Sequence, residues 1–124
     1  MADPKRQKRY AVGIAAEKRV AGYLENLGFD IVNERYKTPY GEIDLIGLSN
    51  QVLTFVEVKA RKSLSEGLHS VTPKSQRRIS NAAQLWLAEN ADKIGEQHEI
   101  RFDVAIVTPD GSISYMKSAF QSES

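Results

Sequence analysis

The chain has 124 residues, enough for one compact domain, and its apolar fraction of 41% is typical of a globular protein. It contains no cysteine, which excludes disulfide bonds, thiolate metal sites and cysteine nucleophiles, so oxygen ligands and two histidines remain for metal. The formal net charge is only +1, but residues 1–20 and 59–78 each carry six Lys or Arg, against two and one Asp or Glu.

The first nine residues are basic, as in a signal peptide, but no long apolar segment follows them. We therefore expect residues 1–9 to form a basic tail, and we expect a cytoplasmic protein without a membrane partner. No repeat, low-complexity tract or linker divides the rest of the sequence. The predicted organisation is a single domain over residues 10–120, followed by a C-terminal tail over residues 121–124.

The first half of this domain predicts one helix and three strands. Apolar residues recur at helical spacing from Tyr10 to Leu27, and Gly28 is a natural stop. The strands predicted after this helix cover residues 29–32, 42–48 and 52–60, with turn-prone residues at 38–41. A short polar turn at Ser49-Asn50 separates the last two strands, which predicts a β-hairpin.

The second half predicts a loop, a second helix and a last hairpin. Residues 61–70 are polar and contain Gly67, which indicates a loop. Thr72 and Pro73 read as an N-cap and a first helical residue, and the helical period continues to Glu89. The strands of the last hairpin cover residues 100–106 and 113–116, around a turn at 109–111. This order predicts an α/β fold, a mixed β-sheet flanked by helices.

Two charged residues lie on one face of the apolar strand at residues 52–60. Because side chains alternate along a strand, Glu57 and Lys59 point to the same side, with their backbones roughly 6.5–7 Å apart. The two side chains can therefore converge on one bound group. The alternative is a buried salt bridge between Lys59 and a nearby acid.

The register of the predicted hairpin places a second carboxylate, Asp44, near them. If Ser49-Asn50 is a two-residue turn, Asp44 lies opposite Phe55 and shares a face with Glu57. Two carboxylates and a lysine suit phosphodiester hydrolysis, because magnesium takes one or two carboxylates and keeps positions open for water and phosphate. Lys59 would lower the pKa of the attacking water or neutralise charge on the phosphoryl oxygens.

Three strings of residues carry a resemblance to a known family. Asp44, followed thirteen positions later by Glu57-Val58-Lys59, is similar to the PD-(D/E)XK nuclease signature. The strings GEIDLI (41–46), FVEVK (55–59) and RFDV (101–104), in that order, resemble the YraN family of bacterial proteins, which is related to Holliday-junction resolvase-like endonucleases. The resemblance covers roughly residues 10–120.

This resemblance implies a restriction-endonuclease-like core and a DNA endonuclease that uses Mg²⁺, with Mn²⁺ as a substitute. It implies that Asp44, Glu57 and the Val58 carbonyl are metal ligands and that Lys59 is the catalytic lysine. Ile43 replaces the proline of the motif, but that proline binds nothing.

Resolvase-like members also use a glutamate of the first helix, and the helical period independently singles out Glu17. At about 100° per residue, Glu17 falls in the middle of the apolar face formed by Ile14, Ala21 and Leu24. A charge in this position requires a partner or a metal, which makes Glu17 a candidate catalytic residue and metal ligand. A carboxylate at the rim of the site, paired with an arginine, is the alternative.

The first turns of the helix predicted at residues 73–89 are rich in basic residues. Free backbone N–H groups at a helix start favour anions, so this region is a candidate for DNA phosphate contacts. The candidate residues are Lys74, Gln76, Arg77 and Arg78. Ser75 stands where the family pattern has a lysine, so no substrate-binding role is assigned to it. A helix end that is merely solvated is the alternative.

Four further residues receive no catalytic or binding role from the sequence. His69 and His98 have no second histidine or cysteine at metal-ligand spacing, so both are assigned to structure or solvent. Trp86 is assigned to the core. Asp103 is left open between a support for the site and a surface acid.

The leading functional hypothesis is a metal-dependent endonuclease that hydrolyses DNA, including branched or single-stranded DNA. A homodimer would suit a four-way junction, which offers two equivalent strands. A nucleic-acid-binding module that keeps the fold without cleavage is the main alternative. A protein-interaction subunit whose basic segments are incidental is a third.

Overall fold

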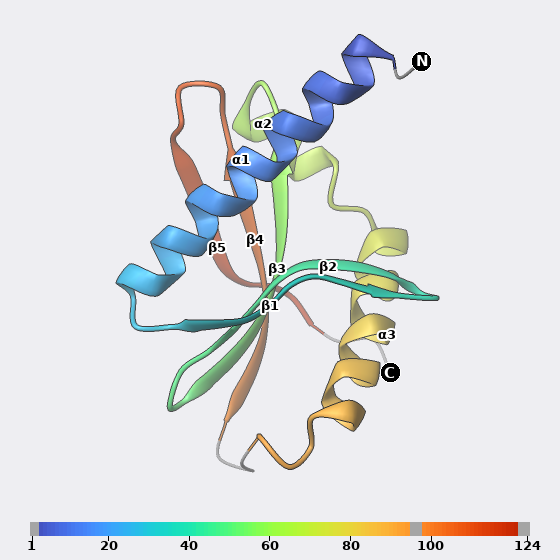
Figure 1. The fold of residues 1–124 in the computed structure, drawn as a ribbon, viewed down its shortest axis with the longest axis vertical. Coiled ribbons are helices and arrows are strands. Elements are labelled where there is room, and N and C mark those ends of the chain that lie inside the picture. Colours follow the sequence, from blue (N-terminus) through green and yellow to red (C-terminus); the bar gives the residue numbers. More distant parts are fainter. Residues whose placement is uncertain (1–2, 95–97, 122–124) are drawn as a thin grey trace.

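The structure is a computed structural model that describes residues 3–94 and 98–121. In these ranges the elements, in chain order, are α1 (Pro4–Asn26), β1 (Asp30–Thr38), β2 (Gly41–Leu48), β3 (Val52–Ala60), α2 (Leu64–His69), α3 (Pro73–Glu89), β4 (Glu99–Val107) and β5 (Ile113–Phe120) (Figure 1). The strands form one sheet in the order β1-β2-β3-β4-β5, and β3 and β4 are its parallel neighbours. The predicted mixed sheet flanked by helices is confirmed, and it is consistent with a restriction-endonuclease-like fold.

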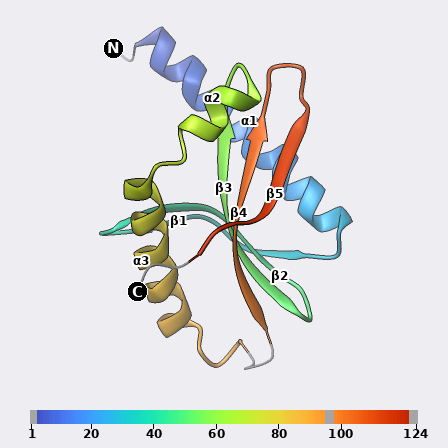
Figure 2. The same cartoon turned by 180° about the vertical axis from the view of Figure 1, so that it is seen from behind.

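The two long helices cover opposite faces of this sheet (Figures 1 and 2). Adjacent residues of β3 alternate between two cores, because Phe55 belongs to the core under α3 and Val56 to the core under α1. Trp86 of α3 is buried and meets Phe55 edge-on, as expected for a core residue. Leu24 anchors α1 in the second core. The sheet is therefore buried on both sides around its central strand.

Helix α1 begins at Pro4, six residues before the predicted start at Tyr10. Residues 4–9 lack an apolar period, but the Asp3 side chain accepts a hydrogen bond from the Lys5 N–H at 3.0 Å and proline occupies the first helical position. Most of the predicted basic tail is thus helical.

Among the described residues, no helix combines the length and apolar character that crossing a bilayer requires. Residues 122–124 of the predicted C-terminal tail lie outside the described residues.

The segment expected to be a loop, residues 61–70, contains the short helix α2 instead. Ser63 caps it by accepting a hydrogen bond from the Glu66 N–H at 3.2 Å. A six-residue helix is too short to show an apolar period, which explains why the sequence did not reveal it. Strands β1 and β5 are longer than predicted, whereas α3 has its predicted bounds.

The hairpin of β2 and β3 exists, but its turn is Asn50-Gln51 rather than Ser49-Asn50. Ser49 closes this turn by donating its N–H to the Val52 carbonyl at 2.8 Å. Ile46 therefore pairs with Phe55, and the predicted pairing of Asp44 with Phe55 is wrong. The register moves by two residues, so Asp44 reaches Val58 rather than Phe55. The predicted alternation also fails along β2, because Ile43 and Ile46 lie in the core under α3 while Leu45 lies in the core under α1.

Gly67 allows α2 to lie directly against the sheet. A Cβ at this position would lie 2.5 Å from Cγ2 of the buried Ile106, which is closer than real side chains approach. We expect Gly67→Ala to lower the free energy of unfolding by about 1–3 kcal/mol through overpacking, as measured by urea denaturation. Gly22→Ala in α1 is the matched control, because its Cβ would meet nothing within 4 Å and alanine favours the helix. Equal stability of the two variants would contradict close packing of α2.

Candidate functional site

The site forms where β2 separates from β3. Backbone pairing between these strands ends at Leu45 and Val56, and the side chain of Asp44 takes over. Its Oδ2 accepts a hydrogen bond from the Val58 N–H at 2.8 Å. The Asp44 carboxylate is thereby fixed in the gap between two diverging strands. The N–H and C=O of one strand residue point to the same side, so the Val58 carbonyl also faces this gap.

On the other side of β2, β1 contributes a strained arginine. Arg35 lies between the paired residues of the β1–β2 ladder, opposite Asp44, and has φ +52°. This left-handed conformation costs a residue other than glycine roughly 1–2 kcal/mol. Its guanidinium donates from Nε and from a terminal nitrogen to Glu17 Oε2, both at 3.2 Å, and from the other terminal nitrogen to the Tyr10 hydroxyl at 2.7 Å. The strain is thus located beside the acids of the site.

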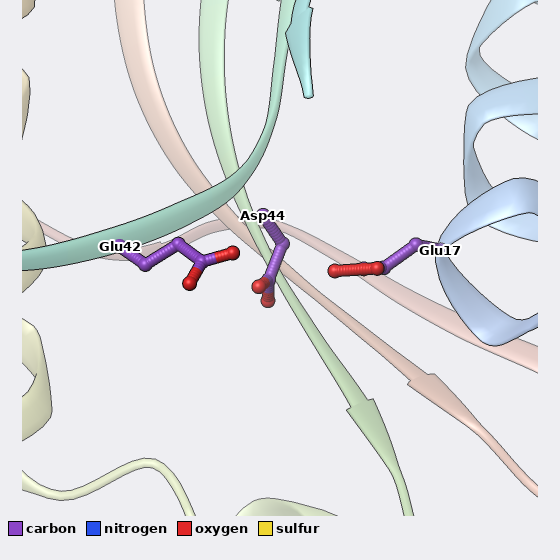
Figure 3. Close-up of side chains that lie close together, drawn as sticks. All are labelled: Glu17, Glu42 and Asp44. Carbon is purple, nitrogen blue, oxygen red and sulfur yellow. The ribbon is translucent and has the colours of Figure 1, made fainter. Parts of the chain in front are cut away.

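Three carboxylates converge on this gap (Figure 3). Glu17 reaches it from α1, while Glu42 and Asp44 are two residues apart on β2. One oxygen of each lies within 4.8 Å of the others. The predicted convergence of Glu17 and Asp44 is therefore present in the structure, with Glu42 as an added member.

Glu57 and Lys59 lie next to this cluster, on β3. The Lys59 Nζ is 3.7 Å from Glu57 Oε1, and both side chains are largely buried. Glu57 is close enough to raise the pKa of Asp44, and Lys59 is close enough to lower it. The alternative of a buried salt bridge between Lys59 and a nearby acid thus has its ion pair. This pair also holds the Lys59 ammonium beside the acidic cluster.

The alternative for Glu17 was a carboxylate at the rim of the site that is paired with an arginine. This pairing is present, because Arg35 contacts Glu17. The Glu17 side chain is nevertheless only 16% exposed. Burial and the charge of Asp44 raise its pKa above the ordinary value, and Arg35 offsets this only in part. Glu17 is thus both paired and part of the acidic cluster.

The site contains more carboxylates than cations. Burial, followed by Glu57, raises the pKa of Asp44 well above its ordinary value, and the Val58 N–H and Lys59 compensate only in part. Of the charged groups described above, four are carboxylates and two, on Arg35 and Lys59, are cations. When all are ionised, two negative charges remain, which one divalent cation would balance. Clustered carboxylate oxygens are the donors that Mg²⁺ and Mn²⁺ prefer, so the residues fit such an ion.

Glu42 is the one member of the cluster that sequence reasoning missed. The signal was available, because Glu42 and Asp44 are two apart on a predicted strand and therefore share a face. The side chain is exposed, as an ordinary surface acid would be. Only the position of α1 shows that Glu17 approaches the same point.

The basic residues of α3 lie near the other end of β2. The Arg78 side chain packs against Gly41, where a Cβ would be 3.4 Å from the Arg78 Cβ. Gly41 precedes Asp44 by three strand residues, or about 10 Å. Lys74 and Arg77 are exposed and Gln76 is half-buried. The structure thus places Arg78 against Gly41 at the start of β2.

Ser75, which replaces the family's lysine, has a structural role. Its N–H donates to the Thr72 hydroxyl at 3.1 Å, and its own hydroxyl accepts from the Thr72 N–H at 3.0 Å. These reciprocal bonds form a capping box at the start of α3.

The two histidines form hydrogen bonds with backbone carbonyls, His69 with that of Ser65 and His98 with that of Ser49. Among the described residues, the group of converging acids includes neither histidine.

Asp103 is a fully buried support, not a surface acid. Its Oδ2 accepts hydrogen bonds from Thr54 at 2.7 Å, Tyr115 at 2.6 Å and Arg101 at 2.9 Å, and its Oδ1 accepts one from the Ser118 N–H at 2.9 Å. These partners belong to β3, β4 and β5. Asp103 therefore ties the parallel centre of the sheet to its edge.

The raised pKa of Asp44 leads to a prediction for the metal-free protein. The folded state holds a proton on Asp44 at pH values where the unfolded chain has lost it, so the parent should lose stability as pH rises above about 4. Asp44→Asn removes this penalty and keeps an acceptor for the Val58 N–H. We expect the variant to gain on the order of 1 kcal/mol over the parent at pH 8, and little at pH 4, in urea denaturation with chelator.

The exposed Asp30 provides the matched control, because Asp30→Asn should change stability little at either pH. A stability difference between Asp44→Asn and the parent that does not vary with pH would contradict this electrostatic account.

Sequence comparisons place the chain among known relatives. The sequence model of the "Uncharacterised protein family UPF0102" matches residues 16–107. A UPF0102 protein of Bradyrhizobium diazoefficiens is 41% identical over 120 residues, which are 97% of this chain and 89% of the relative. UPF0102 proteins of Rhodopseudomonas palustris (strain BisB18) and Nitrobacter winogradskyi are each 43% identical, over 96% and 90% of this chain and 87% and 92% of their own lengths. The chain therefore belongs to the UPF0102 family, the YraN-like family that its sequence strings resemble.

Proposed function

We propose that this protein is a magnesium-dependent endonuclease that hydrolyses DNA phosphodiester bonds. The observation that carries the proposal is the convergence of Glu17, Glu42 and Asp44 at the gap between β2 and β3, with Lys59 beside it. When these carboxylates are ionised, Arg35 and Lys59 neutralise only part of their negative charge, and the site is partly buried. A purely structural site would be expected to pair that charge with arginine or lysine.

The proposal assigns a task to each group. Asp44, Glu42 and Glu17 hold the divalent ion, together with Glu57 and the Val58 carbonyl on the β3 side of the gap. Bound there, Mg²⁺ supplies charge that stabilises the phosphoryl oxygens and makes a water more acidic.

The Lys59 Nζ is positioned to neutralise charge on the phosphoryl group or to orient the attacking water. Glu57 keeps this ammonium in place through the 3.7 Å ion pair. Arg35 restrains Glu17 and limits the repulsion among the acids when no ion is bound.

The resemblance of three residues to the PD-(D/E)XK nuclease signature supports this proposal. The residues that resemble the signature are Asp44, Glu57 and Lys59. Lys59 forms an ion pair with Glu57, and both are close enough to Asp44 to change its pKa, although Asp44 and Glu57 are thirteen positions apart in the sequence. The basic start of α3, beside the beginning of β2, would contact the phosphates of DNA. A cytoplasmic setting, which rests on the apolar pattern of the sequence, is a further part of the proposal. So is a homodimer that matches the symmetry of a four-way junction, which rests on the resemblance to resolvase-like endonucleases.

The catalytic assignment predicts that cleavage depends on each of three residues. Asp44→Ala, Glu57→Ala and Lys59→Ala should each lower the rate of DNA cleavage by about 100-fold or more, because each removes a ligand or the charge beside the scissile phosphate. Initial rates with Mg²⁺ or Mn²⁺ should be measured on duplex, flapped, single-stranded and four-way DNA. Binding should survive in all three variants.

Asp30→Ala, which removes an exposed acid at the far end of β1, is the control and should cleave like the parent. Full activity of the three site variants would overturn the nuclease assignment. Absence of cleavage by the parent on all four substrates, together with DNA binding, would instead favour the binding module that keeps the fold without catalysis.

A further inference from the structure

The N-terminal half of α1 projects past the sheet as a helical arm (Figures 1 and 2). Residues 3–12 are all exposed, including Tyr10 at 63%. The arm carries four cations, Lys5, Arg6, Lys8 and Arg9, and none of them forms a salt bridge with a described acid. The arm is therefore a strongly basic surface for which the described part of the chain offers no anionic partner.

The helix itself disfavours these cations. Positive charge near a helix N-terminus opposes the macrodipole, and the first turn contains no acid. Lys5 and Arg9 are four residues apart and Arg6 and Arg9 are three apart, spacings at which like charges repel. An anion along the arm would relieve both penalties. The charge thus fits a polyanion better than a second copy of this basic arm or an apolar partner.

The direction of the arm is set by its contact with the site. The Tyr10 hydroxyl accepts the Arg35 hydrogen bond, and Arg35 in turn holds Glu17. Tyr10 and Glu17 therefore share a helix face that looks toward the acidic cluster. At about 100° per residue, Arg6 and Arg9 lie within about 80° of Glu17 on this face, whereas Lys8 lies about 180° away and Lys18 about 100° away on its far side.

Arg6 and Arg9 lie far enough from Glu17 to contact phosphates other than one bound at the acidic cluster. With a rise of about 1.5 Å per residue, Arg9 and Arg6 lie roughly 12 and 16 Å from Glu17 along the helix axis. One strand of duplex DNA advances about 3.4 Å per nucleotide along the duplex axis, so both distances exceed the spacing of neighbouring phosphates. We propose that Arg6 and Arg9 bind the phosphate backbone of duplex DNA, at phosphates other than the one at the acidic cluster. This inference rests on the proposed function.

The test is the salt dependence of duplex binding in chelator, where no cleavage occurs. Arg6→Gln combined with Arg9→Gln should lower the slope of log affinity against log salt by roughly two units, at about 0.9 per lost phosphate contact. Lys8→Gln combined with Lys18→Gln removes the same charge from the other side of the same helix and should leave the slope nearly unchanged. Glutamine forms helices about as well as the residues it replaces, so the arm should keep its structure.

Amide hydrogen exchange of the parent gives a second measurement. Duplex DNA should slow exchange over residues 5–12, and this protection should be lost in the variant lacking Arg6 and Arg9. Equal slope changes in the two double variants, or binding without protection of the arm, would overturn the inference. Failure of the parent to bind duplex DNA would overturn both the arm and DNA as the partner. An arm-dependent slope without cleavage on any substrate would support the arm and reject only the nuclease activity.

Discussion

The hydrogen bond from the Val58 N–H to Asp44 Oδ2 is the interaction on which the rest of the site depends. It replaces a backbone pair at the point where β2 leaves β3, so a side chain closes the sheet where the backbone cannot. The gap that results holds the Asp44 carboxylate against the backbone of β3. Glu17 from α1, Glu42 from β2 and Glu57 from β3 meet Asp44 there only because the two strands diverge.

This arrangement sets stability against function. Burial and neighbouring acids raise the pKa values of Asp44 and Glu17, and Arg35 adds a left-handed backbone conformation beside them. The surrounding fold compensates elsewhere. Asp103 ties β3, β4 and β5 together through four hydrogen bonds, and two apolar cores hold α1 and α3 on opposite faces. A rigid sheet can therefore carry a strained and poorly neutralised site.

Local signals account for what the sequence could predict. The bounds of α3 follow from Thr72 and Pro73, and the pairing of charges on β3 follows from strand alternation. The hairpin turn was misplaced by one residue, so Asp44 was paired with the wrong residue of β3, and strict alternation fails along β2 where Ile43 and Ile46 share one core. Helix α2 was missed because six residues carry no period. Glu42 and Arg35 gain their positions from the way β1 and β2 turn away from β3, a tertiary feature that no local pattern encodes.

The central claim is that the converging carboxylates form a site for a divalent cation. The most direct measurement is the shift in melting temperature of the parent, Asp44→Asn and Asp30→Asn when Mg²⁺ or Mn²⁺ replaces chelator. A ligand that binds only the folded state raises the melting temperature by mass action. The account predicts a clear rise in the parent and in Asp30→Asn, and a much smaller rise in Asp44→Asn. An equal rise in all three proteins, or no rise in the parent, would contradict it.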